Sequence, residues 1–206
     1  MRGWSISRKA AAGMASASGA RDSLGVVILA GGDGRRMGGR KPQRLLGERS
    51  LLNRAITRAQ RWSETVVISV RSRDQVGGVE LPLVFDPPGL AGPLAGLAAA
   101  RELGCARVLT IPCDMPFLPD DLPRRLAAAL PGRAAALASA GGRLQSVCGL
   151  WTAEALAGIE EYAASGQTSL VGFARTIGFA VAELEDAAAD NLNTPAELAA
   201  AAARLG

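Results

Sequence analysis

The chain alternates short apolar runs with segments of helical periodicity, and this alternation restricts its fold more than any other feature. Residues 25–30 (GVVILA) and Thr65–Val70 (TVVISV) are apolar and rich in β-branched residues, which predicts buried strands. Residues 50–61 instead place apolar side chains three and four positions apart, with Ser50 positioned to cap a helix. We therefore expect an α/β fold of three layers with a mostly parallel central sheet.

The same two patterns continue to the C-terminal end. They predict further strands at 83–85, 107–111 (stopped by Pro112), 133–138, 144–151 and 179–181. They predict further helices at 92–103, 119–130, 153–164, 169–176 and 194–204. Thr194 and Glu197 have the spacing of a capping box. Residues 24–206 thus predict a single domain, and residues 1–23, rich in Ala, Ser and Gly, predict a disordered leader.

The amino-acid composition excludes several classes of function. The sequence has no histidine, which excludes zinc sites and histidine-based acid–base catalysis as its main chemistry. Cys105, Cys113 and Cys148 are far apart and odd in number, so we expect reduced thiols in a cytoplasmic protein. The net charge is +4, but no basic stripe interleaved with aromatic residues predicts nucleic-acid binding. No apolar segment is long enough to predict a membrane span.

A glycine-rich segment directly follows the first predicted strand and reads LAGGDGRRMGGRKP, residues 29–42. Glycines in such a turn can direct several backbone N–H groups at an anion. The segment is not a P-loop, because its lysine is displaced and is followed by Pro42 instead of a hydroxyl residue. It is not a dinucleotide fingerprint either, because Met37 stands where the third glycine belongs.

Three notable segments follow predicted strands: 29–41, 86–92 and 112–116. Ligands of a parallel sheet bind outside the carboxyl ends of its strands. We therefore expect the three segments to form one site.

Four motifs in this order resemble those of the MobA-type molybdenum cofactor guanylyltransferases, which are nucleotidyltransferases. The first is the LAGGDGRRMGG loop with the Lys-Pro that follows it, and the second is FDPPGLAGPLAG at 85–96. The others are IPCDMP at 111–116 and NLNTP at 191–195. The resemblance spans residues 25–198 and implies a Rossmann-like fold of the nucleotide-diphospho-sugar transferase type.

The resemblance also implies a reaction. GMP passes from GTP to the terminal phosphate of molybdopterin, pyrophosphate leaves, and molybdopterin guanine dinucleotide forms. Such phosphoryl-group chemistry needs no protein nucleophile, because positioning and neutralised charge can supply most of the catalysis. Mg²⁺ is the implied cofactor. A monomer with transient contacts to molybdoenzyme chaperones or molybdopterin-synthesis proteins is the implied assembly.

The resemblance assigns nucleotide binding to residues from three strand ends and the loop: Leu29, Ala30, Gly31, Gly32, Arg36, Lys41, Ser69, Asp86 and Asp114. Lys41 is the single lysine of residues 24–206 and suits a phosphate oxygen. Arg35 and Arg36 can add charge at the triphosphate, and ordinary solvated charge is the alternative for either. Asp86 precedes two prolines, so a turn residue is the alternative there.

Asp114 directly follows an apolar strand, where a carboxylate can hold a Mg²⁺ that also bridges substrate phosphates. A helix cap is the alternative role for Asp114. Asp114 and Lys41 are our candidates for catalysis. Asn191 and Asn193 would reach the site from the C-terminal segment, toward phosphate or a metal-bound water, or would cap the last helix. Cys113 is expected to be a buried small residue, because no histidine is present to activate it.

The chain departs from the family pattern at three places. Arg40 stands where the family has an acid, in a loop one residue shorter; Ser69 replaces an asparagine; and Gln145-Ser146 replaces a proline. Two alternatives stay open. One is the sister cytidylyltransferase that uses CTP, whose loop reads LAAG where Gly31 gives LAGG here. The other is a non-catalytic escort protein that binds nucleotide or cofactor. We also hypothesise a groove for the pterin phosphate near Arg73, Arg143 and Arg175.

Overall fold

The computed structural model describes residues 23–32, 39–87 and 89–205. The disordered leader predicted for 1–23 therefore lies outside the described residues, except for Ser23.

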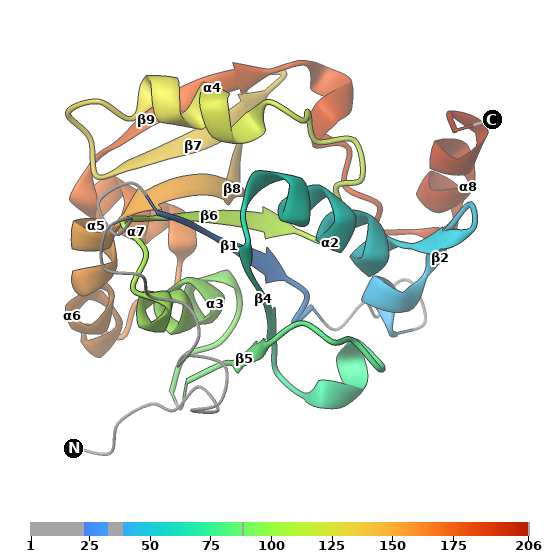
Figure 1. The fold of residues 1–206 in the computed structure, drawn as a ribbon. Coiled ribbons are helices and arrows are strands. Elements are labelled where there is room, and N and C mark those ends of the chain that lie inside the picture. Colours follow the sequence, from blue (N-terminus) through green and yellow to red (C-terminus); the bar gives the residue numbers. More distant parts are fainter. Residues whose placement is uncertain (1–22, 33–38, 88, 206) are drawn as a thin grey trace.

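Seven strands form one sheet in the order β5-β4-β1-β6-β8-β7-β9, which Figure 1 shows across the middle of the molecule. The strands are β1 (Leu24–Leu29), β4 (Thr65–Val70), β5 (Leu83–Phe85), β6 (Arg107–Pro112), β7 (Ala135–Ala140), β8 (Arg143–Thr152) and β9 (Phe179–Leu184). β8 runs antiparallel to both of its neighbours, and the other neighbouring pairs are parallel. The predicted, mostly parallel sheet is confirmed.

Helices cover both faces of this sheet, so the fold has three layers (Figure 1). One face packs against α2 (Leu51–Trp62) and α4 (Leu122–Ala129). The other packs against α3 (Pro93–Ala100), α5 (Ala153–Ala157), α6 (Ile159–Ala164) and α7 (Leu170–Ile177). None of the helices in the described part of the chain has the length and apolar character needed to cross a membrane.

The central strand β1 shows why its sequence is an unbroken apolar run. Val26 and Ile28 are buried in the core on the α2 and α4 side, whereas Val27 is buried in the core on the α3 side. Because successive side chains of a strand point to opposite faces, a strand covered on both sides needs apolar residues at every position.

The elements agree with the sequence patterns with a few differences at the ends. β6 ends at Pro112 as expected, but it includes this residue, which pairs in register with Leu29. The helix expected at 119–130 begins at Leu122, and the one expected at 153–164 divides at Gly158 into α5 and α6. Ser50 caps α2 as expected, accepting a hydrogen bond from the Asn53 N–H.

Short elements complete the fold. They are a hairpin of β2 (Leu45–Leu46) and β3 (Arg49–Ser50), and the 3₁₀ turns η2 (Lys41–Gln43), η3 (Arg73–Gln75), η4 (Arg101–Leu103) and η5 (Asp186–Ala189). The sequence patterns predicted none of them except η4, which lies at the end of the helix expected at 92–103. The last helix, α8 (Pro195–Ala203), lies beside this hairpin, away from the main sheet (Figure 1).

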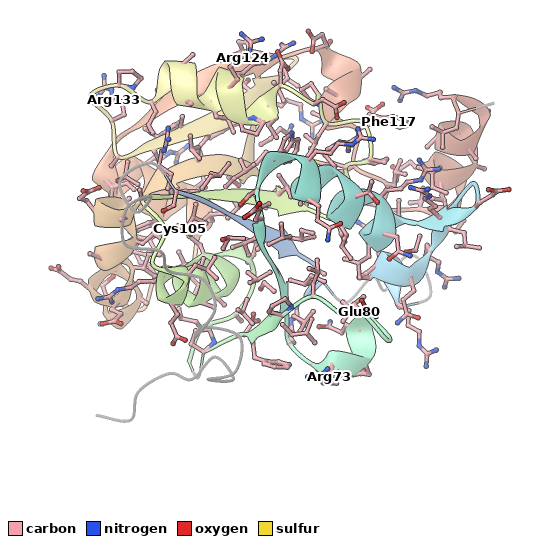
Figure 2. All side chains as sticks on the ribbon, in the orientation of Figure 1. Arg73, Glu80, Cys105, Phe117, Arg124 and Arg133 are labelled. Carbon is pink, nitrogen blue, oxygen red and sulfur yellow. The ribbon has the colours of Figure 1, made fainter. Side chains whose placement is uncertain are left out.

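A small separate core joins α8 to the hairpin. Leu46, Leu51, Leu192 and Ala201 are buried together, with Phe117 packed against them. Figure 2 shows Phe117 on the side of the molecule where α8 lies, and the Arg204 guanidinium stands 3.9 Å from the centre of the Phe117 ring. This core fixes the segment just before α8 against the end of β6.

Candidate functional site

A cleft of about 220 Å³ opens at the carboxyl ends of β1, β4, β5 and β6. Among the residues predicted to bind nucleotide, eight line it: Leu29, Ala30, Gly31, Gly32, Lys41, Ser69, Asp86 and Asp114. The motifs found in the sequence also supply Pro42, Gly92, Pro93, Pro112 and Cys113 to the cleft, whereas Arg71 and Val147, which line it too, lie outside those motifs. The three segments that follow predicted strands do form one site, as expected for a parallel sheet. Arg35 and Arg36 lie outside the described residues.

Lys41 joins two other motifs inside this cleft. Its Nζ donates hydrogen bonds to Oδ2 of Asp114 and, at 2.7 Å, to Oδ1 of Asn193. The partners are 73 and 152 residues away in the sequence. The side chains of Lys41 and Asp114 are only 12% and 17% exposed. A buried cation with oxygen partners from two directions can be aimed at a phosphate without a large search of side-chain conformations.

The backbone on each side of this contact is fixed locally. Arg40 has φ 48° and ψ 36°, a left-handed conformation that is uncommon outside glycine, and the turn η2 follows with Pro42 buried. At the end of β6, the Cys113 N–H donates to the Leu29 carbonyl at 3.2 Å, which extends the ladder one residue beyond the strand. Asp114 therefore emerges directly from the sheet, and its side chain need not depend on a long loop.

One oxygen of Asp114 has no partner. Its Oδ1 is buried and accepts no hydrogen bond within the described part of the chain, although Oδ2 is paired with Lys41. A buried carboxylate oxygen without a partner costs desolvation energy, so this oxygen, unpaired among the described residues, is suited to accept a cation or a hydrogen-bond donor.

Known proteins resemble this chain over most of its length. The MobA-like NTP transferase domain family matches residues 26–178. A molybdenum cofactor guanylyltransferase of Cereibacter sphaeroides is 40% identical over 185 residues, covering 87% of this chain and 95% of the relative. The chain belongs to the MobA-like NTP transferase family. A second relative is a molybdenum cofactor guanylyltransferase of Rhodobacter capsulatus. It is 37% identical over 188 residues, and the alignment again covers 87% of this chain and 95% of the relative.

A solved structure of similar fold agrees. Molybdopterin-guanine dinucleotide biosynthesis protein A from Archaeoglobus fulgidus has a TM-score of 0.71 and 20% identity, covering 87% of this chain and 97% of its own. The resemblance to the MobA-type guanylyltransferases and the Rossmann-like nucleotidyltransferase fold are both confirmed.

Asp86 forms one wall of the cleft in this MobA-like domain. Burial raises the pKa of its carboxyl above the ordinary value, while the Arg71 cation and the Gly92 N–H act in the opposite direction. Its own N–H donates to the Val70 carbonyl at 3.3 Å. The residue thus shapes the turn after β5 and also presents a carboxylate to the cleft, so the two interpretations of Asp86 are compatible.

Gly96, from the GPLAG motif, has a packing role that explains the residue type. A methyl group at position 96 would lie 2.5 Å from Cδ2 of Leu29 and 2.6 Å from Oγ of Ser69. Ser69 itself is only 4% exposed. Glycine therefore lets α3 approach β1 and β4 closely, which brings the N-terminus of α3 to the cleft.

The two asparagines of the NLNTP motif do not cap α8. The cap is made by Thr194, whose hydroxyl accepts from the Glu197 N–H at 3.2 Å, and by Glu197, whose carboxylate accepts from the N–H groups of Asn193 and Thr194. The predicted capping box is present. The Asn193 side chain instead contacts Lys41, and its Nδ2 lies 3.5 Å from the Asn191 carbonyl.

The three arginines hypothesised for the pterin phosphate do not share a groove. Arg143 pairs with Ala140 at the carboxyl end of β7, whereas Arg175 lies in α7 just before Phe179, which pairs with Ala135 at the amino end. Arg73 lies on η3, beyond the other half of the sheet (Figure 2). The antiparallel direction of β8 places Arg143 at the carboxyl edge of the sheet, whereas Arg175 lies at the opposite edge because it precedes β9, which runs parallel to β7.

Sequence reasoning also missed two glutamines near the site. Gln43 and Gln75 make side-chain hydrogen bonds that join η2, η3 and Gly31. Ser72 and Gln75 form a capping box, and their spacing was the one available signal that this turn is built to hold its shape.

Proposed function

We propose that this chain transfers GMP from GTP to the terminal phosphate of molybdopterin and releases pyrophosphate. The observation that carries the proposal is the meeting of Lys41, Asp114 and Asn193 in a cleft at the carboxyl ends of the strands. The relatives that share 37% to 40% identity over 95% of their own length are molybdenum cofactor guanylyltransferases.

The residues of the cleft fit a magnesium ion that is held by few protein ligands. In the described part of the chain, no three His, Cys, Asp or Glu side chains are grouped closely enough to hold a metal by themselves. Mg²⁺, however, usually binds one or two carboxylates and takes its remaining ligands from water and substrate phosphates. Asp114, with its unpartnered Oδ1, supplies such a carboxylate. When bound, the ion would neutralise charge on the phosphates of GTP.

Lys41 is suited to bind the phosphates directly. Its ammonium already has two oxygen partners, and a phosphate oxygen can replace either of them when GTP enters. Asp114, then released from part of this pairing, becomes available as a metal ligand. The pair is mostly buried, so in the absence of substrate each charge offsets the desolvation cost of the other.

Among the described residues that line the cleft, Cys113 is not suited to act as a nucleophile. Burial raises the pKa of this thiol far above its ordinary value, and the nearby Asp114 charge raises it further. A neutral buried thiol is a poor nucleophile. The terminal phosphate of molybdopterin therefore attacks GTP itself, and the protein holds the two polyanions together.

We assign the reaction to the cytoplasm, with a monomer that meets chaperones or molybdopterin-synthesis proteins transiently. The three cysteines are unpaired and buried, as suits a reducing compartment.

The test is pyrophosphate release with Mg²⁺ and molybdopterin, with GTP and CTP in parallel. We expect release with GTP and much less with CTP. Release with CTP alone would assign the chain to the sister cytidylyltransferases. No release with either nucleotide, from a folded protein that still binds GTP, would leave only the escort protein.

Gly31 offers a direct test of the choice between nucleotides. A methyl group there would find its nearest neighbours, Cγ and N of Arg71, at 3.6 Å, which is ordinary contact. The Gly31→Ala variant should therefore fold normally, and we expect its preference for GTP over CTP to fall by about tenfold. The ratio of kcat/KM for the two nucleotides measures this. An unchanged ratio would remove Gly31 from the determinants of specificity.

A further inference from the structure

A single glutamine side chain binds the turn after β4 to the glycine-rich segment after β1. Oε1 of Gln75 accepts hydrogen bonds from the N–H groups of Arg71, at 2.8 Å, and of Ser72, at 3.3 Å. Its Nε2 donates to the Gly31 carbonyl at 3.2 Å. One amide thus holds backbone groups from two strand ends.

A second glutamine ties the lysine segment to the same turn. Nε2 of Gln43 lies 3.2 Å from both the Asp74 carbonyl and the Gln75 carbonyl. Gln43 is the last residue of η2, which begins with Lys41. The turn η3 is therefore connected to Gly31 on one side and to the Lys41 segment on the other.

These three segments frame a polar cavity of about 220 Å³ that continues from the cleft. It is lined by Gly32, Arg40, Pro42, Ser72, Asp74 and Gln75. Gly32 and Pro42 also line the main cleft. The turn η3 is thus part of the wall against which the described ends of the glycine-rich segment rest.

We propose that Gln75 is a positioning residue, which orients the Gly31–Gly32 peptide for the nucleotide and, through η3 and Gln43, sets its spacing from Lys41. The proposal rests on the nucleotidyltransferase function proposed above and extends it to a residue that does not touch the reacting atoms. Because a peptide group is planar and trans, a Gly31 carbonyl fixed toward Gln75 turns the Gly32 N–H the opposite way.

The amide chemistry of glutamine is essential to this role. Oε1 is an acceptor for two N–H groups while Nε2 is a donor to a carbonyl, and a carboxylate can perform only the first task. Gln75→Glu keeps the shape and the bonds to Arg71 and Ser72. It removes the donor to Gly31 and places a carboxylate oxygen against a carbonyl oxygen.

The experiment is GTP binding by calorimetry, without molybdopterin, for the wild type, Gln75→Glu and Gln43→Glu. Gln60→Glu is the control, because it makes the same chemical change on the exposed face of α2. We expect the dissociation constant to rise about tenfold for Gln75→Glu and to rise in the same direction for Gln43→Glu. Gln60→Glu should bind as the wild type does, and the midpoints of thermal unfolding should stay close to the wild-type value.

Steady-state kinetics separate positioning from a general loss of structure. Gln75→Glu should raise KM for GTP more than it lowers kcat, and Gln75→Met, which loses all three hydrogen bonds, should be worse than Gln75→Glu. Wild-type affinity in a folded Gln75→Glu variant would overturn the proposal. If the wild type binds GTP but releases no pyrophosphate, the proposed function fails, while the binding constants still decide the role of Gln75.

Discussion

The two halves of the sheet differ in how their strands are connected and in whether they contribute to the cleft. β5, β4, β1 and β6 run parallel, and the segments that follow them form the cleft. In the other half, β7 and β8 are joined by a tight hairpin at Gly141 and Gly142, both with positive φ. Among the described residues of this half, Val147 alone lines the cleft. Parallel strands need long crossovers, which leave loops at their carboxyl ends, whereas a two-residue hairpin leaves no room for a ligand.

Charged groups differ between the halves in the same way. In the cleft, Asp114 has an oxygen without a partner among the described residues, and burial raises the pKa of Asp86. Beside β7, Asp121 at the start of α4 binds both Arg124 and Arg125. Figure 2 shows Arg124 on the outer surface, far from Arg73. The carboxylates that line the cleft are thus only partly paired within the described residues, whereas Asp121 binds two arginines.

The largest expected effect comes from Asp114→Ala. Removing this carboxylate takes away the candidate metal ligand and one partner of Lys41, so we expect pyrophosphate release to fall by about 10²- to 10³-fold. The backbone carbonyl of Asp114 still accepts from the Leu192 N–H, so the fold should persist. The matched control is Asp121→Asn in the other half, which should keep full activity. A variant that retains a tenth of the activity would contradict the role given to Asp114.

Gly96→Ala should be the most damaging of these changes to stability. The new methyl group would stand 2.5 Å from Leu29 and 2.6 Å from Ser69, and overpacking of this kind costs about 1–3 kcal/mol of unfolding free energy. Gly158→Ala is the control, since its nearest neighbour would be at 3.7 Å. Urea unfolding of both variants measures the difference, and equal stabilities would mean that α3 can shift freely.

Asn193→Ala should have a smaller effect, confined to activity. Lys41 loses a hydrogen bond of 2.7 Å, and we expect kcat/KM for GTP to fall about tenfold. Thr194→Ala removes the cap of α8 instead and should cost about 1 kcal/mol of stability with little effect on activity. Should Asn193→Ala destabilise the protein as Thr194→Ala does, its contact with Lys41 would be structural only.

The smallest effect concerns the pH dependence of stability, and its sign should reverse between the halves. Asp86 has a pKa raised mainly by burial, so its ionisation disfavours the folded state. Asp86→Asn should therefore gain stability over the wild type as the pH rises through the carboxyl range, and lose the gain in acid.

Asp121 should behave in the opposite way. Burial acts to raise its pKa, but hydrogen bonds from Arg125 and Arg124 outweigh this and lower it. Its ionised form favours folding above the unfolded pKa, and that contribution is lost as the pH falls through the lowered value. Asp121→Asn should thus lose stability at neutral pH. Unfolding of both variants at pH 3 and pH 7 checks the pair; the same sign in both would refute the contrast.

Much of the fold followed from local patterns. The runs that form β1 and β4 are mostly apolar because both faces of these strands are covered. Ser50 and Thr194 indicated the starts of their helices because their side chains cap them. The hairpin β2–β3 was not predicted because two-residue strands have no periodicity. The division of the helix expected at 153–164 was not predicted because an isolated glycine, such as Gly158, is often tolerated within a helix.

The sequence by itself determined the order of the elements and the four motifs, because strand and helix periodicity and motif spacing are properties of neighbouring residues. Tertiary structure alone decided that Lys41 meets Asp114 and Asn193, that α3 approaches closely only over Gly96, and that Gln75 reaches Gly31. It also decided the direction of β9, which places Arg175 at the edge of the sheet opposite to Arg143. Contacts between residues far apart in the chain depend on strand order and direction, which no local pattern records.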